Sequence, residues 1–188
     1  MGRISSQGFT LIELLVVVTI IGILLVVLLP SYSMLGAKTR LQNGADTIIQ
    51  MIDQARTFAV SGYKSRADDL ALSVVGVEMR QGDSTFLLFS CPLRSDTEIP
   101  CDLTARHKIQ QEQLGDIVLR SLSNTEQPPV SYTTALILFP PPFGNGIVVA
   151  DGHVQKAALV MDIGVGMIQS ALIKKLEYVP ATNRVNYE

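Results

Sequence analysis

Few side chains in this sequence have a type and spacing that could support catalysis or metal binding. The chain holds two histidines, His107 and His153, and two cysteines, Cys91 and Cys101. Catalysis needs a nucleophile beside a base or paired acids in a pocket, and a zinc site needs three or four clustered ligands. One histidine stands in a charged stretch and the other beside a turn, as surface histidines do. The sequence therefore predicts no enzyme, no metal site and no cofactor.

Two glycine pairs resemble fragments of nucleotide-binding loops. Gly144-Asn145-Gly146 lacks the Lys-Ser/Thr that completes a phosphate-binding loop. Gly164-Val165-Gly166 lacks the third glycine and the following helix of a dinucleotide-binding loop. Neither pair predicts a nucleotide site.

Glu13 is the ionisable residue in the least ordinary position, because an apolar run follows it. Residues 14–29 carry no charge, and Phe9, Leu11 and Ile12 extend the run to about twenty residues, the length of a membrane-spanning helix. Strands are rarely that long, so the run predicts a helix that crosses the membrane over residues 9–30. A buried core helix is the alternative interpretation.

An acid inside a membrane segment costs about 2.5–3.5 kcal/mol, so Glu13 needs a reason to be there. One interpretation is that Glu13 lies near the end of the helix and reaches the headgroups. The other is that it pairs with a cation supplied by assembly, for which the nearest candidate is a free amine made by cleavage after Gly8. Residues 1–8 are not an ordinary secretory signal. In such a signal the apolar segment precedes the cleavage site, whereas in this chain it follows Gly8.

The segment Gly8-Phe9-Thr10-Leu11-Ile12-Glu13-Leu14-Leu15 resembles the class III signal of type IV prepilins and type II secretion pseudopilins. In that family a membrane-embedded aspartic peptidase cuts between the glycine and the phenylalanine and then N-methylates the phenylalanine. The resemblance implies cleavage between Gly8 and Phe9, methylation of Phe9, an assembly role for Glu13 and a helix bend at Pro30. It also implies a single-pass protein of the inner membrane with its head outside the cytoplasm. The implied partners are membrane lipid, the prepilin peptidase, an assembly platform and other pilin subunits.

The two cysteines are ten residues apart, and the stretch between them begins and ends with Pro92 and Pro100. In an exported head they are expected to form a disulfide that closes this loop, with two reduced thiols as the alternative. The formal net charge is −2 and the lysines and arginines are dispersed, so nucleic acid is not an expected partner.

An amphipathic helix is predicted to follow the apolar run over residues 31–62. Its apolar stripe recurs at steps of three and four and consists of Leu41, Ala45, Ile48, Ile52, Ala55 and Ala59. The stripe is expected to cover a globular head, with a coiled-coil seam as the alternative. Gly62 fits a left-handed cap that ends the helix.

Residues 63–188 are predicted to form a β-rich head, because the hydrophobic period changes to two. Strands are expected at 70–79, 85–90, 117–122, 132–139, 147–150 and 154–161, with an Asp151-Gly152 hairpin turn and another turn at Gly164 and Gly166. Residues 102–115 read as a loop or short helix, 167–179 as a strand or a helix, and the tail after Pro180 as irregular. The expected fold class is α+β, with one antiparallel sheet packed on the long helix.

The segment Phe139-Pro140-Pro141-Pro142-Phe143-Gly144-Asn145-Gly146, with the strands after it, is similar to the head of the GspH/FimT-like minor pseudopilins. The predicted function is therefore a structural filament subunit of a type IV pilus-like or type II secretion system. The alternative is a membrane-tethered minor pilin that binds DNA, a surface or an exported substrate at a filament tip. A tethered periplasmic enzyme is a third hypothesis, which would leave Met1 uncut.

Overall fold

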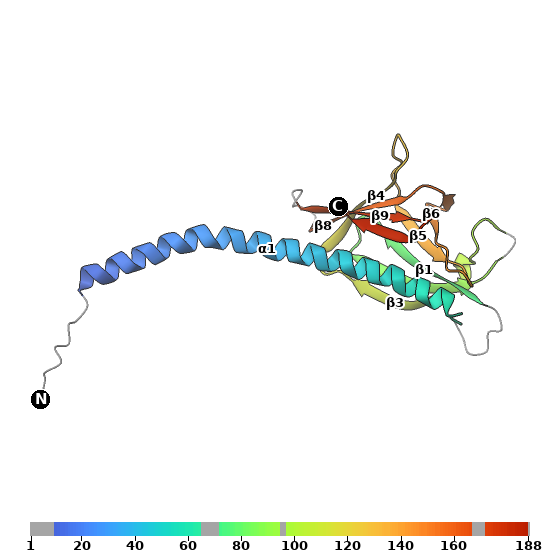
Figure 1. Cartoon of the computed structure of the whole chain (residues 1–188), viewed down its shortest axis with the longest axis horizontal. Coiled ribbons are helices and arrows are strands. Elements are labelled where there is room, and N and C mark those ends of the chain that lie inside the picture. The colour runs from blue at the N-terminus through green and yellow to red at the C-terminus, as the bar shows by residue number, and fades with distance from the viewer. Residues whose placement is uncertain (1–9, 65–71, 95–96, 167–171, 188) are drawn as a thin grey trace, which may run out of the picture. The chain divides into compact units, whose positions relative to one another are not determined.

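The computed structural model describes residues 10–64, 72–94, 97–166 and 172–187, and for residues 27–34 it describes the backbone alone. The chain divides into two units, Met1–Thr39 and Arg40–Glu188, and each is described by itself. A long helix precedes a run of strands, as Figure 1 shows, which confirms the α+β class. The elements are α1 (Leu11–Val60), β1 (Ser73–Arg80), β2 (Thr85–Pro92), the 3-10 helix η1 (Leu103–Ala105), β3 (His107–Gln113), β4 (Ile117–Asn124), β5 (Thr134–Phe139), β6 (Ile147–Ala150), β7 (His153–Gln155), β8 (Leu159–Val165), β9 (Ile173–Val179) and β10 (Arg184–Tyr187).

The strands form two antiparallel sheets where one was expected. The larger has the order β3-β2-β1-β5-β6-β7, and the smaller has the order β10-β9-β8-β4. The turn between β1 and β2 joins them: Gly82 N donates to Leu119 O at 2.7 Å, and Leu119 N donates to Asp83 O at 3.0 Å. These bonds satisfy backbone groups along β4 that would otherwise lie at an open sheet edge.

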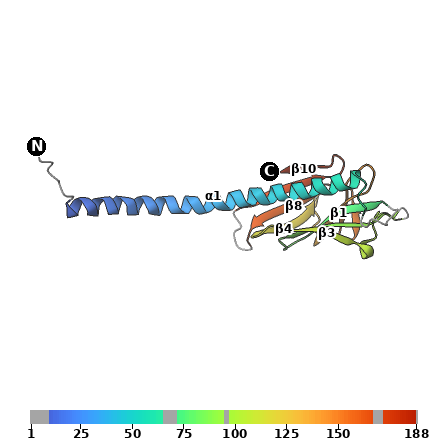
Figure 2. The same cartoon turned by 90° about the horizontal axis from the view of Figure 1, so that it is seen from below.

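The C-terminal part of α1 packs on the head through the predicted stripe. Leu41, Ala45, Ile48, Ile52, Ala55 and Ala59 are all at most 5% exposed. The fit is close at Gly44, where a Cβ would lie 3.1 Å from Cγ1 of Ile117 in β4. Figure 2 shows this part of the helix running alongside the strands. The stripe therefore packs on the head, as expected, and does not form the coiled-coil seam that was the alternative.

A Schellman motif ends α1 at Gly62, as the sequence predicted. Gly62 has a φ of +72°, which favours glycine. Tyr63 N donates to Phe58 O at 3.0 Å, and Gly62 N donates to Ala59 O at 3.2 Å. The rings of Phe58 and Tyr63 stack with centroids 5.3 Å apart, which supplies the hydrophobic contact typical of this motif.

The N-terminal unit exposes its apolar side chains. The large hydrophobic residues between Leu11 and Val26 are 48–84% exposed. Across the part of the chain that the structure describes, we find no helix that is both long and apolar enough to cross a membrane. This finding differs from the predicted span over 9–30, of which residue 9 and the side chains at 27–30 lie outside the described residues.

Three predictions for the head are wrong. Residues 107–113, expected in a loop or short helix, form the edge strand β3, and the tail expected to be irregular contains β10. Gly164, expected in a turn, lies within β8. The ambiguous segment forms the strand β9 from Ile173, while residues 167–171 lie outside the described residues.

Candidate functional site

Glu13 lies in the first turn of α1 and forms a capping box with Thr10. Thr10 N and Thr10 Oγ1 donate to Oε2 of Glu13 at 3.4 and 3.3 Å, and Glu13 N donates to Thr10 Oγ1 at 3.4 Å. This reciprocal pattern satisfies backbone donors that a helix start leaves without partners. Sequence reasoning missed Thr10, although Thr-x-x-Glu before an apolar run is the signature of a capping box.

Among the described residues, the apolar surface that follows Glu13 has almost no polar group without a hydrogen-bond partner. Thr19, the one polar side chain between residues 14 and 26, donates its hydroxyl to Leu15 O at 2.7 Å. A hydroxyl bonded to its own helix in this way can enter lipid or a helix bundle at little cost. The charge on Glu13 thus stands at the edge of an otherwise apolar surface.

The other predicted processing and bending residues are described only in part. Gly8 and Phe9 lie outside the described residues. Pro30 lies within α1, whose helical assignment continues through it, and its side chain is outside the description. The cleavage site, the methylation and the bend therefore stay predictions.

Cys91 and Cys101 form a disulfide with their Cα atoms 5.6 Å apart. Cys91 is the seventh residue of β2, and a bridge between Leu93 and Cys101 brings the chain back beside it. Both cysteines are buried in an apolar cluster on the six-stranded sheet, made of Val74, Phe89, Cys91, Cys101, Leu136, Leu138 and Val149. Ile99 of the loop and Leu103 of η1 pack against the same cluster, and the disulfide fastens the loop to the sheet.

Asp102, beside the disulfide, organises the short helix η1. Its Oδ1 accepts hydrogen bonds from Thr104 Oγ1 at 2.6 Å and from Thr104 N at 3.0 Å, and these bonds lower the pKa of the Asp102 carboxyl. Arg94 also forms an ion pair with Asp102 at 3.3 Å. The loop that carries the second cysteine therefore has its own local order.

The two histidines lie on the surface, as the sequence predicted. His107 begins β3, His153 begins β7, and both are exposed. Among the described residues, no group of three or more His, Cys, Asp and Glu could hold a metal ion.

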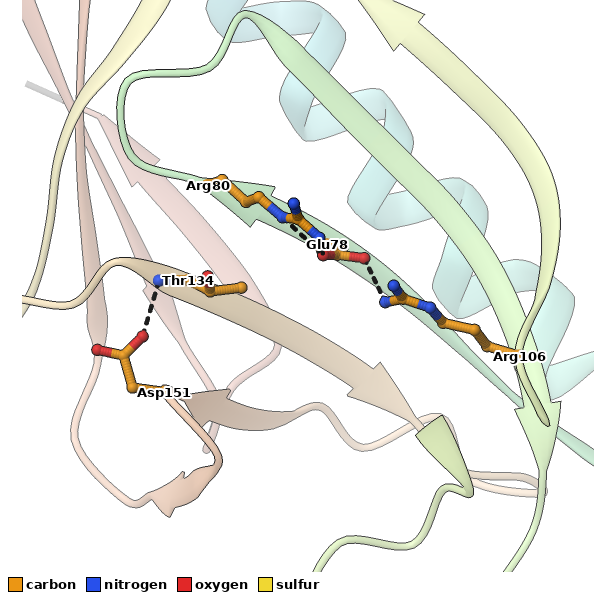
Figure 3. Close-up of polar contacts among 5 residues, drawn as sticks. All are labelled: Glu78, Arg80, Arg106, Thr134 and Asp151. Carbon is orange, nitrogen blue, oxygen red and sulfur yellow. Dashed lines mark hydrogen bonds and ion pairs between the residues drawn. The ribbon is translucent and has the colours of Figure 1, made fainter. Parts of the chain in front are cut away.

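A buried carboxylate on β1 is the largest polar feature that sequence reasoning missed. Glu78 is 5% exposed, and Figure 3 shows it between two arginines. Arg80 Nη2 lies 2.7 Å from Oε1, and Arg106 Nη1 lies 2.6 Å from Oε2. The hydrogen bond to Glu78 raises the pKa of Arg80. The only signal in the sequence was a spacing of two residues, which places side chains on one face of a strand: Glu78 lies in the predicted strand and Arg80 one residue beyond its predicted end.

Asp151 holds the hairpin turn that the sequence predicted. Its backbone has a φ of +46°, and Gly152 follows with a φ of +85°. Oδ1 accepts a hydrogen bond from Thr134 N at 2.8 Å, as seen in Figure 3, so the side chain fixes the start of β5. Its role is structural.

The N-terminal segment matches the model of a known family. Residues 3–29 match the model described as the prokaryotic N-terminal methylation motif. Comparisons with curated proteins and with solved structures gave no match. The motif supports the type IV pilin-like prepilin class, and it covers Gly8, Phe9 and Glu13.

Proposed function

We propose that this pilin-like chain is a structural subunit of a type IV pilus-like or type II secretion filament. In this proposal the chain waits in the cytoplasmic membrane, is cut between Gly8 and Phe9, and is methylated at Phe9. It then joins a periplasmic or extracellular filament through its N-terminal helix. The methylation motif over residues 3–29 supports the class, and the proposal adds the cleavage, the assembly and the partners.

The observation that carries the proposal is an acid at the N-terminal end of an exposed apolar helix. Leu11 and Ile12 are 84% and 72% exposed, and the large apolar side chains after them are also exposed as far as Val26. Water is a poor environment for such a surface, so we expect lipid or like helices to cover it. Either environment makes the charge on Glu13 costly unless a cation accompanies it.

The geometry at Glu13 leaves room for that cation. The bonds from Thr10 both end on Oε2, and no described residue bonds to Oε1. In the proposed assembly, Oε1 accepts from the charged N-terminal amine of Phe9 on a neighbouring copy. The pairing fixes the axial register, because a misplaced neighbour would leave both charges unpaired in a medium of low dielectric.

We also propose the narrower GspH/FimT-like assignment, on the resemblance of the segment from Phe139 to Gly146. Gly144 N donates to Pro140 O at 3.2 Å, and Asn183 Oδ1 accepts from Gly146 N at 2.6 Å. The segment is thus a fixed turn between β5 and β6, tied to the turn before β10. A fixed surface turn suits a head that must present the same face to each neighbour.

Mass spectrometry of the membrane-associated and filament-associated protein tests the proposal. The expected N-terminus is N-methylated Phe9, and the same species should appear in sheared filaments. A mature protein that begins at Met1 in both fractions would contradict the processing and would favour the tethered-enzyme alternative. The amount relative to other subunits separates a filament-body subunit from a tip subunit.

A further inference from the structure

The most exposed aromatic side chain in the described part of the head is Phe143, between β5 and β6. It is 78% exposed, although Gly144 and Gly146, which follow it, are buried. Three prolines precede it, and Asn183 Nδ2 donates to Gly144 O at 3.3 Å. The turn therefore holds the ring outward with little freedom to lose on binding, which favours a contact residue.

A pocket of about 400 Å³ lies elsewhere on the head, between the disulfide loop and the β6–β7 hairpin. Ile99, Leu103 and Val154 supply apolar lining and pack against the buried cluster around the disulfide. The volume falls within the range of about 300–1,000 Å³ that ligand pockets occupy, and the apolar lining suits an aromatic ring.

The charges beside the ring and the pocket are complementary. A Cβ at Gly144 would lie 3.4 Å from Cγ of Arg56, so the exposed Arg56 stands next to the Phe143 turn. The pocket is lined by Arg94, Glu98 and Asp102; Arg94 pairs with Asp102, and among the described residues Glu98 has no ion-pair partner. A copy that places Phe143 in this pocket would bring Arg56 toward Glu98.

We infer that Phe143 of one copy binds the disulfide-loop pocket of the next copy. The contact joins two different surfaces, so it is heterologous, the type of contact from which an open helical filament is built when the rotation between copies does not close a ring. The inference rests on the proposed filament function and adds a head-to-head contact to the contacts of the N-terminal helices. It also assigns the disulfide a task, because the loop it fastens forms one wall of the pocket.

Cysteine crosslinking in filaments of the full chain tests this contact. Asn145→Cys, an exposed position in the Phe143 turn that leaves the ring in place, combined with Thr104→Cys, an exposed position in the pocket, should give a ladder of crosslinked copies under mild oxidation. Asn145→Cys with Thr125→Cys, an exposed threonine outside the pocket, is the matched control and should give none. Arg56→Glu or Glu98→Arg in the crosslinking pair should weaken the ladder, and the two reversals together should restore it.

Each other outcome overturns the inference. Filaments that contain the chain but give no ladder would exclude the contact and leave the proposed function standing, with a foreign partner as the ligand of the pocket. Dimers from Asn145→Cys alone, as abundant as those from the pair, would show a symmetric contact instead. Absence of even the natural chain from filaments would contradict the proposed function, and the contact with it.

Discussion

The phenolic oxygen of Tyr178 occupies the space where a side chain at Gly146 would begin. A Cβ built on Gly146 would lie 1.6 Å from Tyr178 Oη. Both residues bond to one acceptor: Gly146 N and Tyr178 Oη donate to Oδ1 of Asn183 at 2.6 and 2.9 Å. This shared oxygen ties β6, β9 and the turn before β10 together.

Gly146→Ala should therefore destabilise the head. The methyl group has no free space, so Tyr178 or the backbone must move, at a cost of about 1–3 kcal/mol or more in the free energy of unfolding. Urea unfolding of the full chain in detergent, followed by tyrosine fluorescence, measures this loss. Gly36→Ala is the control, since nothing lies within 4 Å of that position, and it should be neutral or slightly stabilising. Equal stability of both variants would contradict the close approach.

Tyr178 should make the head sensitive to alkaline pH. Burial raises the pKa of its phenol above the unfolded-state value of about 10. Above pH ~10 the unfolded chain loses this proton while the folded chain keeps it. The contribution of Tyr178 to the free energy of unfolding is therefore complete below pH ~10 and is lost as the pH rises above it. Unfolding free energies of the natural chain and Tyr178→Phe between pH ~8 and ~11 measure the effect. The variant should lose about 1 kcal/mol at neutral pH and show a shallower decline above pH 10, and an identical decline would contradict the assignment.

The helix and the strong hairpins could be predicted because local signals and tertiary burial agree there. The stripe from Leu41 to Ala59 has the helical period, and Asp151-Gly152 supplies two positive φ angles. The edge strand β3 could not, since His107–Gln113 is rich in charged and amide side chains. Its backbone bonds to β2, and its exposed edge needs no apolar alternation.

The polar contacts of the head join residues that are far apart in the sequence, so no local sequence pattern predicts them. Gly164 lies in β8, where the Nε atom of Arg120 is 2.2 Å from the place that a Cβ would take. Arg106 reaches Glu78 across 28 positions. The candidate assembly site is the opposite case, because Thr10 and Glu13 are three residues apart and their spacing alone identifies the cap.

Removing the disulfide should destabilise the head by about 2–3 kcal/mol, because the unfolded chain gains the entropy of the opened loop. The double variant Cys91→Ala/Cys101→Ala avoids a reactive free thiol. Its unfolding free energy should match that of the natural chain under reducing conditions, measured in urea. A natural chain that is equally stable with and without reductant would show that the disulfide does not contribute to the free energy of unfolding.

Glu78→Gln should also destabilise the head, by about 1–3 kcal/mol, because two guanidinium groups lose their shared carboxylate. The amide keeps the size of the side chain, so the loss reports charge and hydrogen bonding. Glu112→Gln on β3 is the matched control, and we expect it to change stability by less than about 0.5 kcal/mol. Thermal unfolding of both variants beside the natural chain measures the difference, and a Glu78→Gln protein as stable as its control would show that the ion pairs are energetically neutral.

Glu13→Val should separate processing from assembly. The change removes the carboxylate proposed to receive the neighbour's amine and also one half of the capping box, which costs the helix start about 0.5–2 kcal/mol. Thr10→Ala removes the cap and keeps the carboxylate, so it controls for the loss of helix stability. We expect Glu13→Val to be cleaved normally yet to be missing from sheared filaments, and Thr10→Ala to be incorporated. Gly8→Val should block cleavage and leave the full-length mass in the membrane. If Glu13→Val enters filaments in the natural yield, the acid has no part in assembly and its role is confined to the helix cap.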